Sequence, residues 1–214
     1  MLESMYVKIV DDNSDMLVCD YYVDRLDNSI DYFKSEPQGN RPIDIINSLF
    51  LGMHAGLWSK LIKSKHFLDY GVSFPDNLNY QEDLYILLAI LPKMEFISYS
   101  PIAYYHYCDN PQALSYNLSL SNMLATRITL LDNIRKDFHY YVSSWQYMVF
   151  EVTIAYSMLM NKCMTDVSFR NYFSTIKPKV LKEKSTFKKS LCVLMVVNGI
   201  CSQSLIHKIR AAYK

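Results

Sequence analysis

The chain has 214 residues, of which 50% are hydrophobic and 20% charged, with 5 Gly and 7 Pro. This composition is typical of a folded globular protein and excludes a disordered tail, a collagen-like repeat and a small disulfide scaffold. The net charge of +1 hides an asymmetry. Residues 1–110 hold 8 Lys/Arg against 16 Asp/Glu, a formal charge of −8, and residues 111–214 hold 14 against 5, a formal charge of +9. An acidic front and a basic rear indicate two roles on one chain, although two unrelated solvated faces would give the same counts.

Hydrophobic periodicity predicts an α/β front region. A helix is expected from the first residues to about Asp12, and then a buried strand over Met16–Val23 and an edge strand near Ile30–Phe33. Further helices are expected from Pro42 to about Leu51, from Leu57 to about Leu68, and from Gln81 to Pro92.

Two β-like runs follow, Met94–Tyr99 and Ile102–Tyr107, separated by Ser100-Pro101. In the second run, alternation places Ile102, Tyr104 and His106 on one face and Ala103, Tyr105 and Tyr107 on the other. Apolar stripes then predict helices to the end of the chain, over about 120–138, 141–159, 166–176, 187–198 and 202–212. We therefore expect an α/β domain over residues 1–116 and an all-α region over residues 117–214.

The five cysteines favour a reducing, cytoplasmic compartment. No two stand at C-x-x-C spacing and their number is odd, so neither a zinc site nor a disulfide framework is indicated. The first residues lack the basic and apolar regions of a signal peptide. The longest nearly unbroken apolar run, Leu191–Cys201, is interrupted by Asn198 and Gly199 and reaches about half the length of a spanning helix.

Glu82 and Asp83 stand at the predicted start of a helix. Carboxylates there are stabilised in the charged form by the helix dipole and by free backbone N–H groups. A carboxylate that faces a cleft can accept a proton from a sugar hydroxyl. Acidic residues are also common in first turns for capping alone, so both interpretations stay open.

Three further residues could carry chemistry. Trp58 could form a flat apolar wall for a pyranose ring and Lys60 could donate a hydrogen bond, although a core Trp beside a surface Lys fits the same pattern. His106 could be a ligand or an acid, or a hydrogen-bonded structural histidine. Asp11-Asp12 lacks further metal ligands at useful spacing and is interpreted as solvated surface, so no metal ligands are assigned.

Six segments, in their order and spacing, resemble the family 2 glycosyltransferases, and most closely the bacterial members that build capsule and surface polysaccharides. The segments are LESMY (2–6), SDMLVCDYY (14–22), LWSKL (57–61), GVSFP (71–75), YQEDL (80–84) and AYYHY (103–107). Each is weak alone, whereas the set is fairly specific. The resemblance covers about residues 1–116, and the rear is similar to the variable tails of these enzymes.

The resemblance implies part of a GT-A fold and an inverting transfer of a sugar from a nucleotide-diphosphate sugar to a glycan or lipid-linked acceptor. It implies that Asp83 is the general base and that Glu82 holds or tunes it. Trp58 and Lys60 match the Trp-x-Lys segment beside the acceptor cleft, and His106 falls in the aromatic strand that follows.

The chain departs from the family at its beginning. Family members start with a strand ending in Pro-x-Tyr-Asn and a nucleotide-binding half that closes with Asp-x-Asp, which coordinates the metal and the donor pyrophosphate. The segment Leu2–Val10 resembles the helix after that motif. We therefore expect a fragment, a truncated gene product or one part of a split enzyme, inactive alone, with Mn²⁺ or Mg²⁺ bound in the complete enzyme rather than by this chain. Strand Met16–Val23 should then present an unpaired apolar edge.

The rear carries a basic segment over residues 177–189, followed by an apolar stretch and further Lys and Arg. This pattern fits the surface of an anionic membrane, at the inner face for a cytoplasmic protein, through residues 177–210. A lysine-rich solvent face fits equally well. Nucleic-acid binding is not expected, because the segment lacks a stacking platform. The alternative to a transferase is a non-catalytic α/β-helical module that binds a partner or a membrane.

Overall fold

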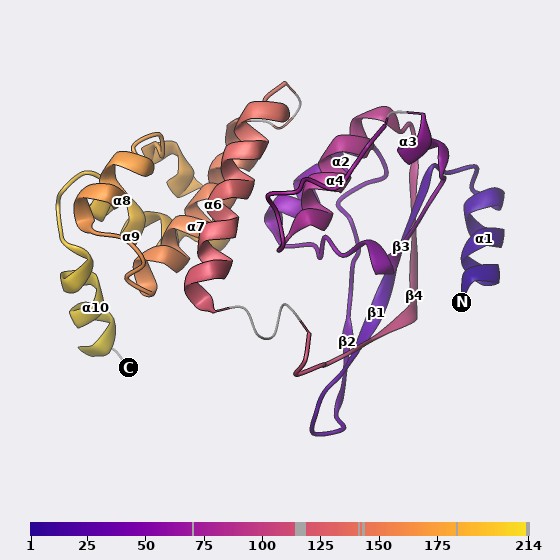
Figure 1. Cartoon of the computed structure of the whole chain (residues 1–214), viewed down its shortest axis with the longest axis horizontal. Helices are drawn as coiled ribbons and strands as arrows, with labels where there is room; N and C mark the ends of the chain where they lie inside the picture. The colour runs from indigo at the N-terminus through magenta and orange to yellow at the C-terminus, as the bar shows by residue number, and fades with distance from the viewer. Residues whose placement is uncertain (70, 114–118, 141, 143, 183, 213–214) are drawn as a thin grey trace.

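The structure is a computed structural model, and it describes residues 1–69, 71–113, 119–140, 142, 144–182 and 184–212. Figure 1 shows an α/β front region beside a helical rear region. The front holds α1 (Leu2–Asp11), β1 (Met16–Asp24), β2 (Ile30–Phe33), α2 (Pro42–Leu51), η1 (Leu57–Ser59), β3 (Lys60–Ile62), α3 (Lys65–Leu68), α4 (Glu82–Ile90), η2 (Leu91–Lys93) and β4 (Ile97–Cys108). The rear holds α6 (Leu120–Asp137), α7 (Ser144–Met160), α8 (Asp166–Tyr172), η3 (Pro178–Lys182), η4 (Lys184–Thr186), α9 (Phe187–Val197) and α10 (Gln203–Ala212). The fold is therefore mixed α/β in front and helical behind, and the predicted boundary between residues 116 and 117 lies outside the described residues.

Strand β1 is the centre of a four-stranded mixed sheet. β4 runs parallel to β1 along its length, and β3 and β2 pair antiparallel with Met16–Val18 and Tyr21–Asp24 respectively. Both of these stretches of β1 are thus paired on two sides. The prediction of an unpaired apolar edge at Met16–Val23 is wrong, because three later segments of the chain return to β1.

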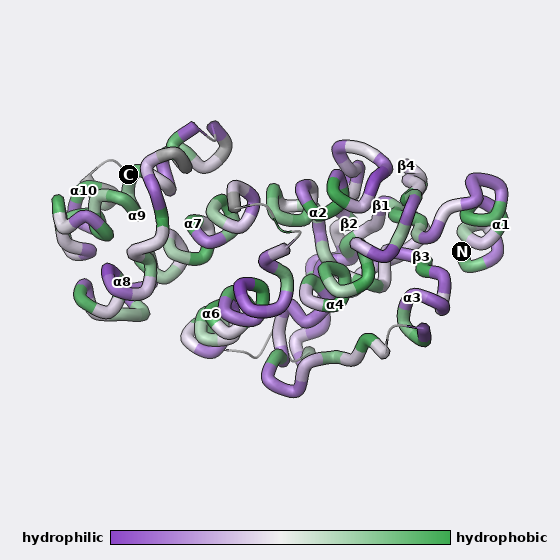
Figure 2. Tube along the Cα trace, turned by 90° about the horizontal axis from the view of Figure 1, so that it is seen from above, coloured by the Kyte–Doolittle hydropathy of each residue, from purple (hydrophilic) through white to green (hydrophobic). Residues whose placement is uncertain are grey.

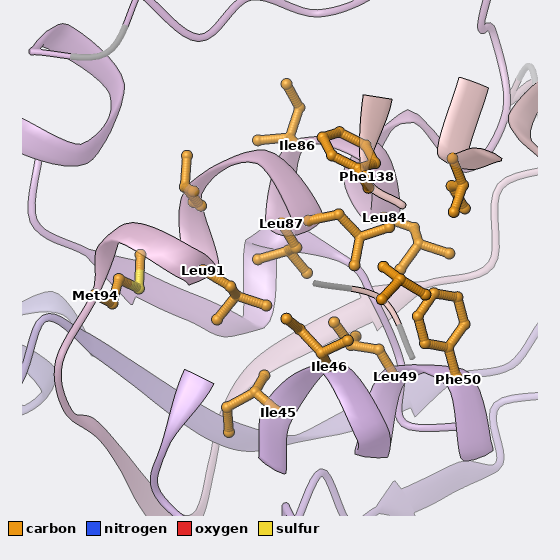
Figure 3. Packing of buried hydrophobic residues seen from close by; sticks show 14 of the residues in the cluster. Ile45, Ile46, Leu49, Phe50, Leu84, Ile86, Leu87, Leu91, Met94 and Phe138 are labelled. Atoms are coloured by element: carbon orange, nitrogen blue, oxygen red, sulfur yellow. The ribbon is translucent and has the colours of Figure 1, made fainter. Parts of the chain in front are cut away.

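The two faces of β1 bury different helices. Met16 and Val18 belong to the main core of the front, which α2 and α4 cover. Figure 3 shows this core, with leucine, isoleucine and phenylalanine side chains of α2 and α4 packed against Phe138. Leu17 and Cys19 point to the opposite face, where they pack with side chains of α1. Burial on both faces explains why this strand is a continuous apolar run.

The predicted helix over residues 57–68 is wrong. This segment forms η1, then β3, then the single turn α3. Leu61 pairs with Leu17 and Ile62 with Met16, so the backbone bonds that a helix would make locally are made to β1 instead. Tertiary pairing overrides a helical pattern in so short a segment.

The two β-like runs near the end of the front form one strand rather than two. The pairing of β4 with β1 shifts register around Asp20, where Ser100 lies opposite Cys19 and Ala103 opposite Asp20. Pro101 falls within this irregularity, which tolerates a residue without an N–H group. A second register shift leaves Tyr104 between the partners of Asp20 and Tyr21, so the alternation predicted for Ile102–Tyr107 is interrupted at Tyr104. It is regular over Tyr105–Tyr107, which pair with Tyr21–Val23.

Helices α6 and α7 join the two regions. Leu130 and Ile134 of α6, and Phe138 directly after it, are buried in the core of the front, whereas Leu124 and Leu131 are buried in the core of the rear. Figure 2 shows α6 and α7 between the front and the remaining rear helices. No helix in the described ranges combines the length and the apolar character needed to cross a membrane.

Candidate functional site

The first turn of α4 holds the two predicted carboxylates. The chain enters α4 through Gln81, whose φ of 65° is left-handed. The Asp83 carboxylate does not cap its own helix: its Oδ2 accepts a 3.2 Å hydrogen bond from the backbone N–H of Leu57. Burial raises the pKa of Asp83 above its usual value, although this hydrogen bond and the charge of Lys60 act in the opposite direction.

A pocket of about 690 Å³ opens beside this turn. We call it the α4 pocket. Its front wall comes from the end of α2, the loop after it, the start of α4 and β4, and its rear wall comes from α7, η4 and α9. The lining residues are Leu49–Gly56, Trp58, Asn79–Leu84 and Tyr107 in front, and Val149, Phe150, Thr153, Thr186 and Lys189 behind. The helical rear therefore builds part of the pocket that holds Glu82, Asp83 and Trp58.

Trp58 belongs to a cluster of aromatic rings. Its ring stacks on Tyr105 at 4.7 Å, lies 5.2 Å from Tyr107 and meets the edge of Tyr21 at 4.8 Å. The cluster holds Trp58 rigidly at the pocket wall, and Tyr107 extends that wall. A Cβ on Gly56 would lie only 2.6 Å from Trp58 Nε1, so glycine permits this close approach of loop and indole.

Lys60 lies behind the pocket rather than in it. Its side chain is buried, and its ammonium donates hydrogen bonds of 2.9 Å to the carbonyl of His54 and 2.7 Å to that of Gly56. Burial lowers the pKa of Lys60 to about 8, and the nearby Asp83 carboxylate opposes that shift. A third, longer bond of 3.4 Å runs from the ammonium to Ser59 Oγ, so the three N–H groups of Lys60 are directed at acceptors inside the fold. In this arrangement Lys60 supports the loop that carries Trp58 and does not line the pocket.

His106 lies away from the α4 pocket. Alternation along β4 turns it to the face opposite Tyr105 and Tyr107, where its Nδ1 is 2.9 Å from Asp24 and its ring lies 4.8 Å from Tyr22. The structure therefore does not bring His106 together with Asp83. The alternation predicted for this strand separates His106 from Tyr105 and Tyr107, and only the structure shows that Trp58 lies with those two tyrosines.

Several pocket residues were not predicted. The pattern of β4 placed Tyr107 on one face with Tyr105 but offered no reason to connect it to Trp58. His54 precedes Gly56 by two residues and accepts its N–H at 2.9 Å, a local contact without a sequence signature. Thr153 and Lys189 come from helices 70 or more residues beyond Asp83, and only the packing of the rear on the front reveals them.

The residues interpreted as solvated surface are indeed outside the site. Asp12 forms an ion pair of 2.9 Å with Lys8, one turn earlier in α1. Among the described residues there is no group of three or more His, Cys, Asp or Glu side chains placed to hold a metal ion.

Comparisons with known proteins do not assign the chain to a family. A scan against protein-family models gives no match. A search of curated proteins gives none either. The glycosyltransferase resemblance consequently depends on the six segments described above, and the roles that it implies remain predictions.

Proposed function

We propose that this chain supplies the acceptor side of an inverting, GT-A-type glycosyltransferase, with the α4 pocket as the acceptor site. The observation that supports this proposal is the meeting of Asp83, Glu82 and Trp58 in one pocket. A partly buried carboxylate beside a rigid aromatic wall is suited to orient a sugar ring and to accept a proton from its hydroxyl.

The environment of Asp83 suits a general base. Burial raises its pKa and therefore its proton affinity, and a base works best when its pKa approaches the working pH. The N–H of Leu57 holds one carboxylate oxygen, Oδ2. That contact sets the orientation of the group and leaves Oδ1 for the acceptor hydroxyl. Glu82, on the same turn, adds a second acceptor for neighbouring hydroxyls.

The donor must be bound elsewhere. The sequence contains no Asp-x-Asp, and the described residues present no metal-ligating group of three, so we route no step through a metal on this chain. A nucleotide-sugar-binding partner or segment would bring the donor and its Mn²⁺ or Mg²⁺. The contribution of this chain is to bind the acceptor, orient it against Trp58 and take its proton on Asp83.

Acceptor binding by the whole chain tests the proposal directly. A saccharide array should yield glycans that bind, and Asp83→Asn should weaken that binding roughly tenfold or more, because a charge-assisted hydrogen bond is lost. Asparagine can still accept the Leu57 N–H, so the fold should persist, as circular dichroism would show. Asp76→Asn, which makes the same charge change at an exposed residue outside the pocket, is the matched control.

A transfer assay supplies the second arm. The isolated chain with nucleotide sugars and Mn²⁺ or Mg²⁺ should show no turnover. Turnover that depends on Asp83 would contradict the assignment of the donor site to another polypeptide or segment. If no saccharide on the array binds the native chain more tightly than Asp83→Asn, the result would contradict the acceptor site itself. It would then favour the non-catalytic α/β-helical module.

A further inference from the structure

The start of α9 carries cationic and apolar side chains on one exposed face. In α9, Leu191 lies four residues after Phe187 and three after Lys188, so these three share one side of the helix. Lys184 precedes them in η4, and all four side chains are exposed. Phe187 and Leu191 retain 46% and 42% of their accessible surface. Together with exposed Lys182 in η3 they form what we call the basic face: Lys182, Lys184, Phe187, Lys188 and Leu191.

The cations of the basic face are not neutralised by the ion pairs seen in the described residues. None of those pairs includes Lys182, Lys184 or Lys188. The one acidic residue within residues 177–189, Glu183, lies outside the described residues. The whole rear has a formal charge of +9. Its field therefore favours an anionic partner.

We propose that the basic face docks on an anionic phospholipid bilayer. Lysines attract such a surface, and an exposed aromatic and a leucine beside them can enter the boundary between headgroups and acyl chains. Nucleic acid fits less well, because binders of single strands stack successive bases on several aromatic rings and this face has only Phe187.

Docking here would bring the α4 pocket close to the bilayer. Lys188 belongs to the basic face, and the next residue, Lys189, lines the pocket. One helix end thus joins the two surfaces. This inference goes beyond the proposed sugar transfer and does not depend on it, since vesicle binding and saccharide binding are measured separately.

Co-sedimentation of the whole chain with vesicles tests the proposal. The chain should pellet with vesicles that contain phosphatidylglycerol and not with pure phosphatidylcholine vesicles, and high salt should weaken the binding. Equal pelleting with both vesicle types, or none with either, would overturn it. So would binding of an oligonucleotide without binding of anionic vesicles.

Variants locate the contact. Lys182→Gln/Lys184→Gln/Lys188→Gln should lower the partition coefficient roughly 100-fold, at roughly fivefold for each lysine. Phe187→Ala/Leu191→Ala should lower it roughly tenfold even at low salt, because apolar insertion is lost. The control Lys34→Gln/Lys93→Gln/Lys136→Gln removes three exposed lysines from other parts of the chain and should retain most of the affinity. If the control loses as much affinity for anionic vesicles as the first variant, the vesicles attract the chain through its net charge alone. That result would overturn the assignment of binding to the basic face.

Discussion

The front and the rear carry nearly equal and opposite formal charges but place them differently. In the front, charged groups such as Asp15, Asp20 and Lys60 are buried and hydrogen-bonded, so they act inside the fold. In the rear, most of the described lysines are exposed, whereas Glu151 is buried and pairs with Arg135. The counted charges therefore lie mainly at the surface in both regions, and the front differs because Asp15, Asp20 and Lys60 also act inside its fold.

Asp20 shows what a buried charge does in the front. It lies at the register shift between β1 and β4, and its carboxylate accepts hydrogen bonds from the hydroxyls of Tyr32 and Tyr99 and from the N–H of Ser35. These donors belong to β2, the segment after it and β4. A single carboxylate thus ties together the strands around β1 where regular pairing is interrupted.

Replacing Asp20 should produce the largest effect. Asp20→Ala leaves two hydroxyls and one buried N–H without their acceptor, so the free energy of unfolding should fall by about 4 kcal/mol. Urea denaturation followed by circular dichroism measures it. The exposed Asp69→Ala is the control and should change little. A loss no greater than that of the control would mean that the front does not depend on its buried charges.

Lys60 should make stability depend on pH. Its pKa is about 8 in the folded chain against 10.5 as the ordinary value, so the unfolded chain binds more protons between these pH values. The free energy of unfolding should therefore rise with pH over that window, by up to about 3 kcal/mol. Comparison with Lys60→Met isolates this contribution, because other titrating groups are common to both proteins.

Urea denaturation at several pH values from 7 to 10.5 (roughly the window set by the two pKa values) measures this difference. The free energy of unfolding of the native chain should increase relative to that of Lys60→Met as pH rises. A constant difference would show that the Lys60 ammonium is not desolvated in solution, and would contradict the buried position that supports the Trp58 loop.

The smallest effect on stability is expected from the basic face. Lys182→Gln, Lys184→Gln and Lys188→Gln should each change the free energy of unfolding by less than about 0.5 kcal/mol, because exposed side chains outside ion pairs contribute little. The same denaturation experiment measures it. A destabilisation comparable with that of Asp20→Ala would mean that the rear also uses its charges within the fold.

Local pattern was sufficient for most elements. The predicted helices at the N-terminus, after Pro42 and after Gln81 are confirmed, as are β1, β2 and the helices of the rear. Each has a stripe, an alternation or a start signal within its own residues. The failures, residues 57–68 and the supposed edge of β1, share one cause: the outcome depended on which distant strand paired with them.

The candidate site divides in the same way. The acidic first turn of α4 and the aromatic alternation of β4 could be predicted, since both are local. That Lys60 would turn under the loop, that His106 would lie on the other face from Trp58, and that Lys189 would reach the pocket required the packed molecule. The functional roles of Asp83 and Glu82 stay predictions.

The sequence by itself determined where most helices and strands begin and end, because periodicity and capping act over a few residues. It also determined the opposite charges of front and rear. Only the tertiary structure decided that β1 is paired on both sides and that a pocket forms between α4 and the rear helices. It likewise decided which charged side chains are buried. Strand pairing and burial depend on contacts between residues far apart in the chain, and a local sequence pattern does not predict the energies of those contacts.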